Sequence, residues 1–259
     1  MMKSIAMVIF LLLLGSGVMA QADGGIEDVE AGMTLQMTAP ILPGGARKFM
    51  LRIQTNDVYE CSNYAVDQET ALQGDRVVIK VNGIRRTKPC QTGVGPATSV
   101  IDLSQLTLGE YKVQITINRQ VFKADLQVDS TFFHFSIPKT VDPTLLRIFN
   151  GRLNHIPAGT VWGKCEYVEP SKKAVAMKFM TELEKAGALK SQLPVGNYDE
   201  FYLHTVGTTT EKSIKGERFE FPFVYSYNGS LMPLQEIANG FRKDLKITLK
   251  NDKGEVLGN

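Results

Sequence analysis

The stretch at residues 103–128 constrains the fold of this chain more than any other. Apolar and polar residues alternate over residues 111–117, and the alternation resumes over residues 122–128 after a short turn at Asn118 and Arg119. A period of two places successive side chains on opposite faces of an extended strand. We therefore predict an antiparallel hairpin with one buried and one solvent-facing side.

The residues that lead into the first arm are Leu106-Thr107-Leu108-Gly109-Glu110-Tyr111. This run resembles the tyrosine corner of immunoglobulin-like and fibronectin-like sandwiches. The resemblance implies that the hydroxyl of Tyr111 reaches back to backbone a few residues upstream; an ordinary core tyrosine is the alternative. Val113 stands where an antibody-type domain has a cysteine, so the resemblance covers only the broader sandwich class.

Further strand-like runs precede the hairpin, at residues 33–38, 49–55, 76–81 and 98–103. Together with the hairpin arms they make about six strands in about 95 residues, a spacing typical of a sandwich rather than of a sheet that alternates with helices. We predict that residues 33–130 form an immunoglobulin-like or fibronectin-like β-sandwich.

The N-terminal residues have the three parts of a secretory signal peptide. Lys3 precedes an apolar run at residues 5–14, and small residues follow up to Ala20. We expect cleavage after Ala20 and a secreted or periplasmic mature protein; a signal anchor is the alternative. No later run approaches the roughly 20 apolar residues of a membrane helix, so no transmembrane segment is expected in the mature chain. Residues 21–32, rich in glycine and acid, predict a flexible lead-in.

The charges are nearly balanced, with 29 Lys and Arg against 27 Asp and Glu. Nucleic-acid binding usually needs a strongly basic field, so no nucleic-acid partner is expected. The small basic cluster Arg85, Arg86 and Lys88 is interpreted as a solvated loop, with an anion site as the alternative.

The three cysteines are Cys61, Cys90 and Cys165. Thiols of exported chains tend to be oxidised, and Cys61 and Cys90 lie in polar segments of the same predicted domain, so we predict that they pair. Closing a loop of about 29 residues would stabilise the domain by about 3–4 kcal/mol in the chain-entropy model. Three free thiols are the alternative. The absence of a Cys-x-x-Cys spacing argues against a zinc knuckle and a thioredoxin-like site.

Residues 131–259 predict a smaller α+β domain with one long amphipathic helix. The helix should begin near Ser171 and end at Gly187, because Val175, Phe179 and Leu183 recur at spacings of four. Other elements are expected as strands at residues 132–137, 160–168, 200–206, 218–227 and 245–249, and a short helix at residues 234–241.

No recognised catalytic or nucleotide-binding motif occurs in the sequence, and no catalytic residue or cofactor is assigned. His134, His155 and His204 all lie in the second predicted domain and could hold a metal together with Asp199 or Glu200. Their spacing is no ligand motif, so ordinary histidines are expected.

Two further alternatives concern single residues. Cys165 could act as a nucleophile with His155 as its base, but its place within a strand favours a packed, apolar thiol or an intermolecular disulfide. The triplet Asn228-Gly229-Ser230 is either a glycosylation acceptor or a hairpin turn.

Two classes of function remain open. The first is a secreted or periplasmic, non-catalytic binding or structural protein that contacts another envelope or secreted protein or a glycan. It includes an envelope assembly component and a protease inhibitor whose reactive loop is held by Cys61 and Cys90. The second is a secreted hydrolase or metal-dependent enzyme with its site in the C-terminal domain or in the cleft between the two domains.

Overall fold

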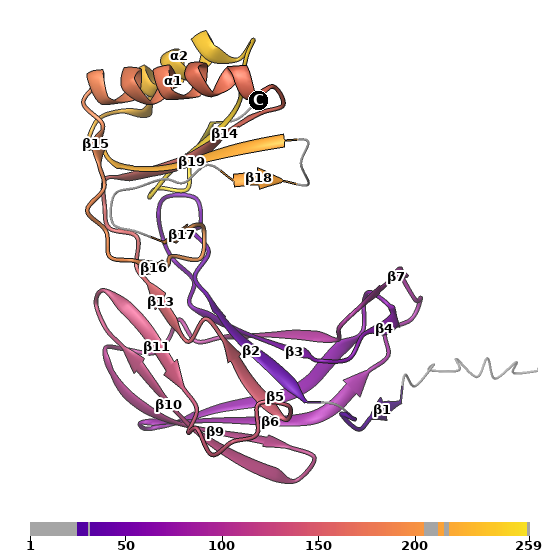
Figure 1. The fold of residues 1–259 in the computed structure, drawn as a ribbon. Helices are drawn as coiled ribbons and strands as arrows, with labels where there is room; N and C mark the ends of the chain where they lie inside the picture. Colours follow the sequence, from indigo (N-terminus) through magenta and orange to yellow (C-terminus); the bar gives the residue numbers. More distant parts are fainter. Residues whose placement is uncertain (1–24, 31, 205–211, 215–217, 258–259) are drawn as a thin grey trace, which may run out of the picture.

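The computed structural model describes residues 25–30, 32–204, 212–214 and 218–257. The described chain is mainly β, with a large curled sheet below and a smaller sheet covered by two α-helices above (Figure 1). The predicted signal peptide, residues 1–20, lies outside the described residues. No helix within them has the length and apolar character needed to cross a membrane.

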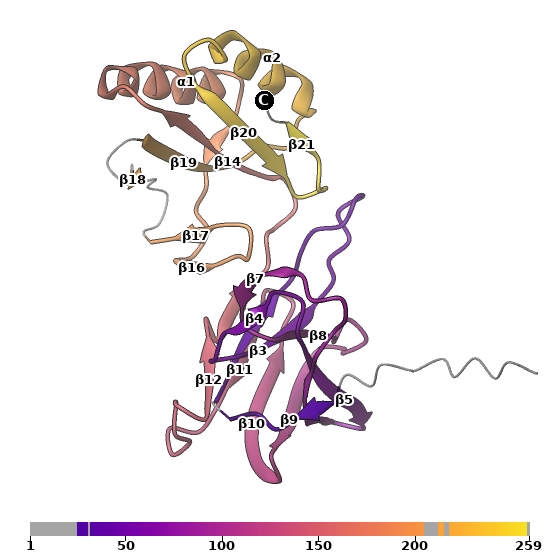
Figure 2. The ribbon, with the colours of Figure 1, turned by 90° about the vertical axis from the view of Figure 1, so that its right-hand side faces the viewer.

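The large sheet follows one hydrogen-bonded path that curls into a half-barrel (Figures 1 and 2). Its inward side chains form a single core that includes Met33, Leu35, Ile53, Ile79 and Ile115. In spatial order its strands are β12 (Leu146–Phe149), β2 (Met33–Thr38), β3 (Met50–Thr55), β8 (Thr98–Asp102), β5 (Ala65–Gln73), β6 (Arg76–Arg85), β9 (Gly109–Ile117), β10 (Gln120–Val128), β11 (Phe132–Ser136), β13 (Arg152–Asn154), β16 (Gly196–Asn197) and β17 (Tyr202–Leu203). The continuous path confirms a mainly β fold, whereas the immunoglobulin-like or fibronectin-like sandwich is not confirmed.

The predicted hairpin is confirmed as β9 and β10, which pair antiparallel with Ile117 opposite Gln120. The two turn residues, Asn118 and Arg119, have φ values of 47° and 68°. A two-residue turn with both φ values positive matches the right-handed twist of the two strands. The alternating apolar residues of both arms are buried, so the period of two was interpreted correctly.

The corner before β9 has the hydrogen bonds that the resemblance implied. The hydroxyl of Tyr111 donates to the backbone oxygen of Thr107 at 2.9 Å and accepts from the Thr107 backbone N–H at 3.0 Å. The ring is buried in the large core, and Tyr111 therefore has a structural role.

Strands after residue 130 complete the large sheet. β11 pairs with β10 and β13 pairs with β11, while β12 pairs parallel with β2 at the opposite end of the path. Gly151, between β12 and β13, allows this crossing, because a Cβ there would lie 2.8 Å from the backbone oxygen of Phe135. Consecutive strands thus join the two ends of the curled sheet.

Part of the predicted lead-in, residues 26–29, contacts the large sheet. β1 (Ile26–Glu27) pairs with the end of β6, and Val29 is buried in the large core. The side chain of Asn118 donates to the backbone oxygen of Val29, so the hairpin turn itself holds this segment.

The small sheet buries one face against the helices. Phe179 and Leu183 of α1 and Leu234 of α2 pack on Cys165 and Phe223 of the sheet. Its elements are β15 (Leu189–Lys190), β18 (Lys212–Ile214), β19 (Arg218–Ser226), β14 (Thr160–Tyr167), β20 (Lys246–Asn251) and β21 (Val256–Leu257), covered by α1 (Lys173–Lys185) and α2 (Leu231–Phe241).

The helix boundaries differ in detail from those predicted. α1 follows a short 3-10 turn, η1 (Pro170–Lys172), and Ser171 is not its cap. The hydroxyl of Ser230 caps α2 by accepting from the Met232 N–H at 3.3 Å. The triplet that begins at Asn228 therefore leads into a helix rather than a hairpin. Gly187, with φ 96°, ends α1 as predicted.

The strand expected at residues 200–206 is shorter in the part that the structure describes. Of residues 200–204, Tyr202 and Leu203 form a strand, β17, which pairs with β16 at the end of the large sheet. Residues 205 and 206 lie outside the described residues.

Candidate functional site

The face of the small sheet that points away from the helices carries a regular grid of side chains. Three strands contribute, and their register defines three rows. The first row is Trp162, Val224 and Lys250; the second is Lys164, Pro222 and Thr248; the third is Glu166, Glu220 and Lys246. Along each strand these positions alternate with the residues that pack against the helices. Because successive side chains of a strand point to opposite faces, the grid lies on the face away from the helices.

A cavity of about 300 Å³ lies on the first two rows of this grid. Its floor is the sheet, and its wall is the segment of residues 200–204, which includes β17. In Figure 1 the β16–β17 hairpin lies below the small sheet, on the side opposite α1 and α2. The cavity therefore forms where the end of the large sheet meets the open face of the small one. Its volume lies at the lower end of the range for small-molecule sites.

The wall is held by a tight turn at Asp199. This residue has φ 67°, and its N–H donates to the side chain of Asn197 at 3.0 Å. Its own carboxylate accepts from the backbone N–H of Ala39 at 2.9 Å. Burial raises the pKa of Asp199, an effect that the Ala39 hydrogen bond opposes. The position of the wall thus depends on the loop that follows β2.

That loop also contacts the small sheet directly. The backbone N–H of Gly44 donates to the oxygen of Lys253 at 3.1 Å, and Arg47 donates to the oxygen of Ile156 at 3.4 Å. Trp162, Tyr198 and Leu203 form a separate buried cluster beside these contacts. The two sheets are therefore joined by packing and by hydrogen bonds at the same place as the cavity.

The cavity combines aromatic rings with paired charges. The ring of Phe201 lies 5.5 Å from that of Trp162, and the ring of Tyr202 lies 4.7 Å from that of His204. Tyr202 is 47% exposed and lines the cavity, so part of an aromatic side chain is accessible there.

The four charged residues in the lining neutralise one another. The Lys164 ammonium lies 2.9 Å from a carboxylate oxygen of Glu220, and the Lys250 ammonium lies 2.7 Å from one of Glu200. Lys164 also contacts Glu166 below the cavity at 2.6 Å, and these hydrogen bonds raise the pKa of Lys164. The lining offers both donors and acceptors without an excess of charge.

Trp162 is the only tryptophan of the chain and is buried at the edge of the cavity. Its indole Nε1 has no hydrogen-bond partner within the described part of the chain. A buried donor without an acceptor costs about 1–3 kcal/mol.

The structure does not bring the three histidines together in one site. His134 is exposed on β11, and the His155 ring packs on Phe133 with its Nδ1 2.8 Å from the Ser130 oxygen. His204 lines the cavity with Glu200, whereas Asp199 lies behind the wall. Among the described residues no three His, Cys, Asp or Glu side chains are grouped so that they could hold a metal ion.

Cys165 lies on the helix-facing side of β14, fully buried in the small core. Burial raises the pKa of its thiol well above the usual range, which disfavours the reactive thiolate. The pairing of Cys165 with His155 has no support, because the His155 ring contacts Phe133 of the large sheet. An intermolecular disulfide is equally disfavoured, since the thiol is not exposed.

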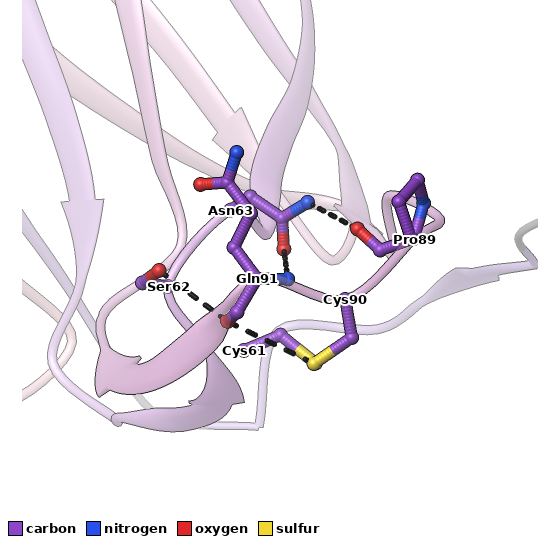
Figure 3. The surroundings of a disulfide bond; sticks show 6 residues. All are labelled: Cys61, Ser62, Asn63, Pro89, Cys90 and Gln91. Atoms are coloured by element: carbon purple, nitrogen blue, oxygen red, sulfur yellow. Dashed lines mark hydrogen bonds between the residues drawn. A yellow bond between two sulfur atoms is a disulfide. The ribbon is translucent and has the colours of Figure 1, made fainter.

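Cys61 and Cys90 form the predicted disulfide beside the two-stranded sheet of β4 and β7 (Figure 3). It joins β4 (Tyr59–Cys61) to the chain before β7 (Thr92–Gly95). The amide of Asn63 supports the same loop, donating to the Pro89 oxygen at 2.9 Å and accepting from the Gln91 N–H at 3.1 Å. The loop is thus held by the disulfide and by two hydrogen bonds of Asn63, and these contacts indicate no particular target.

Two members of the basic cluster beside this loop contact carboxylates. Arg86 lies 2.8 Å from Glu27, and Arg85 pairs with Asp67. These contacts favour the interpretation as a solvated surface over an anion site.

Sequence reasoning identified Glu200 and His204 but missed most of the cavity. The missed residues include Trp162, Lys164, Tyr202, Glu220, Pro222, Thr248 and Lys250. One signal was present: Trp162 and Val224 are large apolar residues at strand positions out of phase with the helix-packed set. An apolar residue on the second face of a half-buried strand indicates that something else covers or uses that face.

No protein-family model, curated protein or solved structure matches this chain. The function must therefore be argued from the site itself.

Proposed function

We propose that this protein is a secreted or periplasmic, non-catalytic binding protein that holds an uncharged saccharide unit of a glycan in the cavity of the small sheet. One observation supports this most: the cavity lining combines exposed aromatic surface with lysines and glutamates that are neutralised in pairs. A sugar ring has the matching chemistry, because its C–H face is apolar and its hydroxyls both donate and accept.

The neutral lining argues for an uncharged unit in the cavity itself. Lys164 and Lys250 each contact a glutamate within 3 Å. A ligand charge of either sign would have to compete with one of these contacts, whereas a hydroxyl can accept from the lysine and donate to the glutamate at once.

A peptide is the less favoured ligand because of where the cavity lies. Extended peptides are commonly bound by adding a strand to the edge of a sheet. Here the cavity is on the face of the small sheet, over β14, β19 and β20, whose backbone groups are engaged in the sheet at that point.

Binding is favoured over hydrolysis for a reason of charge. Glu200 and Glu220 line the cavity, and a pair of carboxylates could serve a glycosidase. A carboxylate that acts on a glycosidic bond must be free to reach it, however, and each of these two carboxylates contacts a lysine ammonium at 2.7–2.9 Å.

The single tryptophan provides the test. The intrinsic fluorescence of Trp162 would be titrated in the mature chain with uncharged oligosaccharides and, separately, with unstructured peptides. We expect saturable changes with at least one saccharide. Tyr202→Ala should weaken the binding of that saccharide about tenfold, which corresponds to about 1.4 kcal/mol of binding free energy.

The matched control is Phe149→Ala, which removes a 55% exposed ring from β12 in the large sheet. It should leave the titration unchanged. Saturation by peptides alone would identify a protein-binding site instead, and release of shortened saccharide during the titration would identify a hydrolase. If no saccharide bound, or if Tyr202→Ala bound as well as the wild type, the proposal would be wrong.

A further inference from the structure

Resting on the proposed function, we infer that the site continues along the small sheet into a cationic subsite, so that the preferred ligand is an acidic saccharide. The subsite consists of Lys246, in the third row of the grid, and Arg218, beyond that row, and both contact Glu166. It would bind the carboxylate, phosphate or sulfate of a sugar that adjoins the unit held in the cavity.

The geometry places this subsite on the same face as the cavity. Lys246 is the β20 partner of Glu166, and Arg218 lies two residues before Glu220 on β19. Residues two apart on a strand share a face and lie about 6.6 Å apart, so the third row is roughly 13 Å from the first. That separation spans adjoining units of an extended chain rather than a single small molecule.

The third row together with Arg218 forms a strip of charged side chains. The exposed surface of this strip is positive because its carboxylates lie deeper than its cations. The side chains of Glu166 and Glu220 are 10% and 17% exposed, whereas those of Arg218 and Lys246 are 54% and 61% exposed. A ligand that approaches the strip therefore meets the cationic groups first.

Arg218 and Lys246 have more N–H donors than their contacts with Glu166 use. Glu166 already contacts Lys164 at 2.6 Å, and Arg218 and Lys246 approach it only at 3.3 and 3.8 Å. Together with Lys164 they make three cations around one buried carboxylate. Arginine has five N–H donors and the lysine ammonium three, which is more than their printed contacts with the described residues use, so donors are left for an anion within that part of the chain.

Glu166 is the carboxylate that holds the cations of this strip in position. Hydrogen bonding to Lys164 and the nearby charges of Lys246 and Arg218 lower the pKa of its carboxyl despite partial burial. It therefore stays ionised and holds the cations in place, and an incoming anion need not organise them.

The test compares matched ligands and matched variants. An uncharged oligosaccharide that binds in the Trp162 titration is compared with its uronic-acid and phosphorylated counterparts at low and high salt. We expect the acidic forms to bind the wild type at least tenfold more tightly at low salt. This advantage should shrink as salt screens the exposed charges.

The variant Arg218→Gln with Lys246→Gln should lose that advantage while changing the affinity for the uncharged form less than twofold. The control is Lys178→Gln with Lys243→Gln, which makes the same change in net charge at exposed positions in α1 and after α2. It should retain the advantage. A preference for uronate over phosphate, or the reverse, would identify the acidic group.

The two proposals fail in different ways. Equal affinity for acidic and uncharged forms, or an acidic preference that survives in the Arg218 and Lys246 variant, would overturn the cationic subsite and leave the saccharide cavity standing. If no saccharide of either kind bound, both the saccharide cavity and the cationic subsite would be overturned. The salt dependence of the wild type gives a result even if the double variant does not fold.

Discussion

The carboxylate of Asp199 accepts a 2.9 Å hydrogen bond from the backbone N–H of Ala39, a residue 160 positions earlier in the chain. This contact joins the wall of the cavity to the loop that leaves β2 of the large sheet. Asp199 also has φ 67°, a conformation that Asp and Asn adopt more readily than other side chains.

Removing this acceptor should destabilise the protein. Asp199→Ala leaves the Ala39 N–H without a partner and puts a less suitable residue at a positive φ, so we expect a loss of about 2–3 kcal/mol in the free energy of unfolding. Asp199→Asn keeps an acceptor and tolerates the conformation, so it should stay within about 1 kcal/mol of the wild type. Chemical denaturation of both variants measures the difference. Equal losses in the two would show that the hydrogen bond contributes nothing.

The charge of Asp199 should appear in the pH dependence of stability. Burial, the largest cause, and nearby Glu200 raise its pKa in the folded state, while the Ala39 hydrogen bond and Arg47 oppose the shift. The folded state therefore binds a proton more readily than the unfolded chain, whose aspartate pKa is about 3.9. Between the two pKa values stability falls as pH rises.

Asp199→Asn should abolish this contribution. The free energy of unfolding of the wild type relative to the variant should decrease as pH increases from about 4 through the folded pKa. Denaturation curves of both proteins over this range provide the measurement. A relative stability that rises with pH would contradict the expected sign.

Tyr111→Phe should cost about 1–2 kcal/mol in the free energy of unfolding. The change removes the hydroxyl that donates to and accepts from the backbone of Thr107 and leaves the buried ring in place. Tyr202→Phe, which changes a tyrosine on the exposed wall, serves as the control and should leave the stability unaltered. Thermal and denaturant unfolding of both variants would show whether the corner is a source of stability.

Reduction of the Cys61–Cys90 disulfide should lower the free energy of unfolding by about 3 kcal/mol, because the open loop gains conformational entropy in the unfolded chain. The bond closes a sequence separation of 29 residues. Unfolding with and without reductant gives the difference, and Cys61→Ser with Cys90→Ser should reproduce the reduced protein and be insensitive to reductant. An unchanged midpoint after verified reduction would contradict this expectation.

Cys165 should not react with a thiol reagent in the native protein. It is buried in the small core, and desolvation raises the pKa of its thiol. In denaturant the same oxidised protein should titrate one thiol per chain, because only Cys165 is free. Rapid labelling under native conditions would instead indicate an accessible thiolate and revive the nucleophile hypothesis.

Local patterns predicted the elements that depend on short-range chemistry. The alternation around Asn118 and Arg119 is sufficient to define a hairpin, since strand period and turn geometry both act within about 20 residues. The tyrosine corner is similarly local, because the hydrogen bonds of Tyr111 span four residues. The disulfide followed from the presence of two cysteines in polar segments of one predicted domain.

Other predictions were incomplete where distant segments compete for a partner. The strand expected at residues 200–206 became β17, paired with the end of the large sheet, because Asp199 and Phe201 fix the preceding turn on Ala39 and Trp162. Residues 26–29 likewise have distant partners, since they pair with β6 and contact Asn118. Neither partner can be recognised from the segment itself.

The sequence by itself determined a mainly β chain with a hairpin, a disulfide and one long amphipathic helix, because periodicity, turn chemistry and cysteine placement act locally. The position and the lining of the cavity were decided only by the tertiary structure. Trp162, Glu220 and Lys250 lie on three strands far apart in the chain, and the register of β14 with β19 and β20 brings them to one face. Register is set by the packing of the opposite face against the helices, and that is a property of the whole fold.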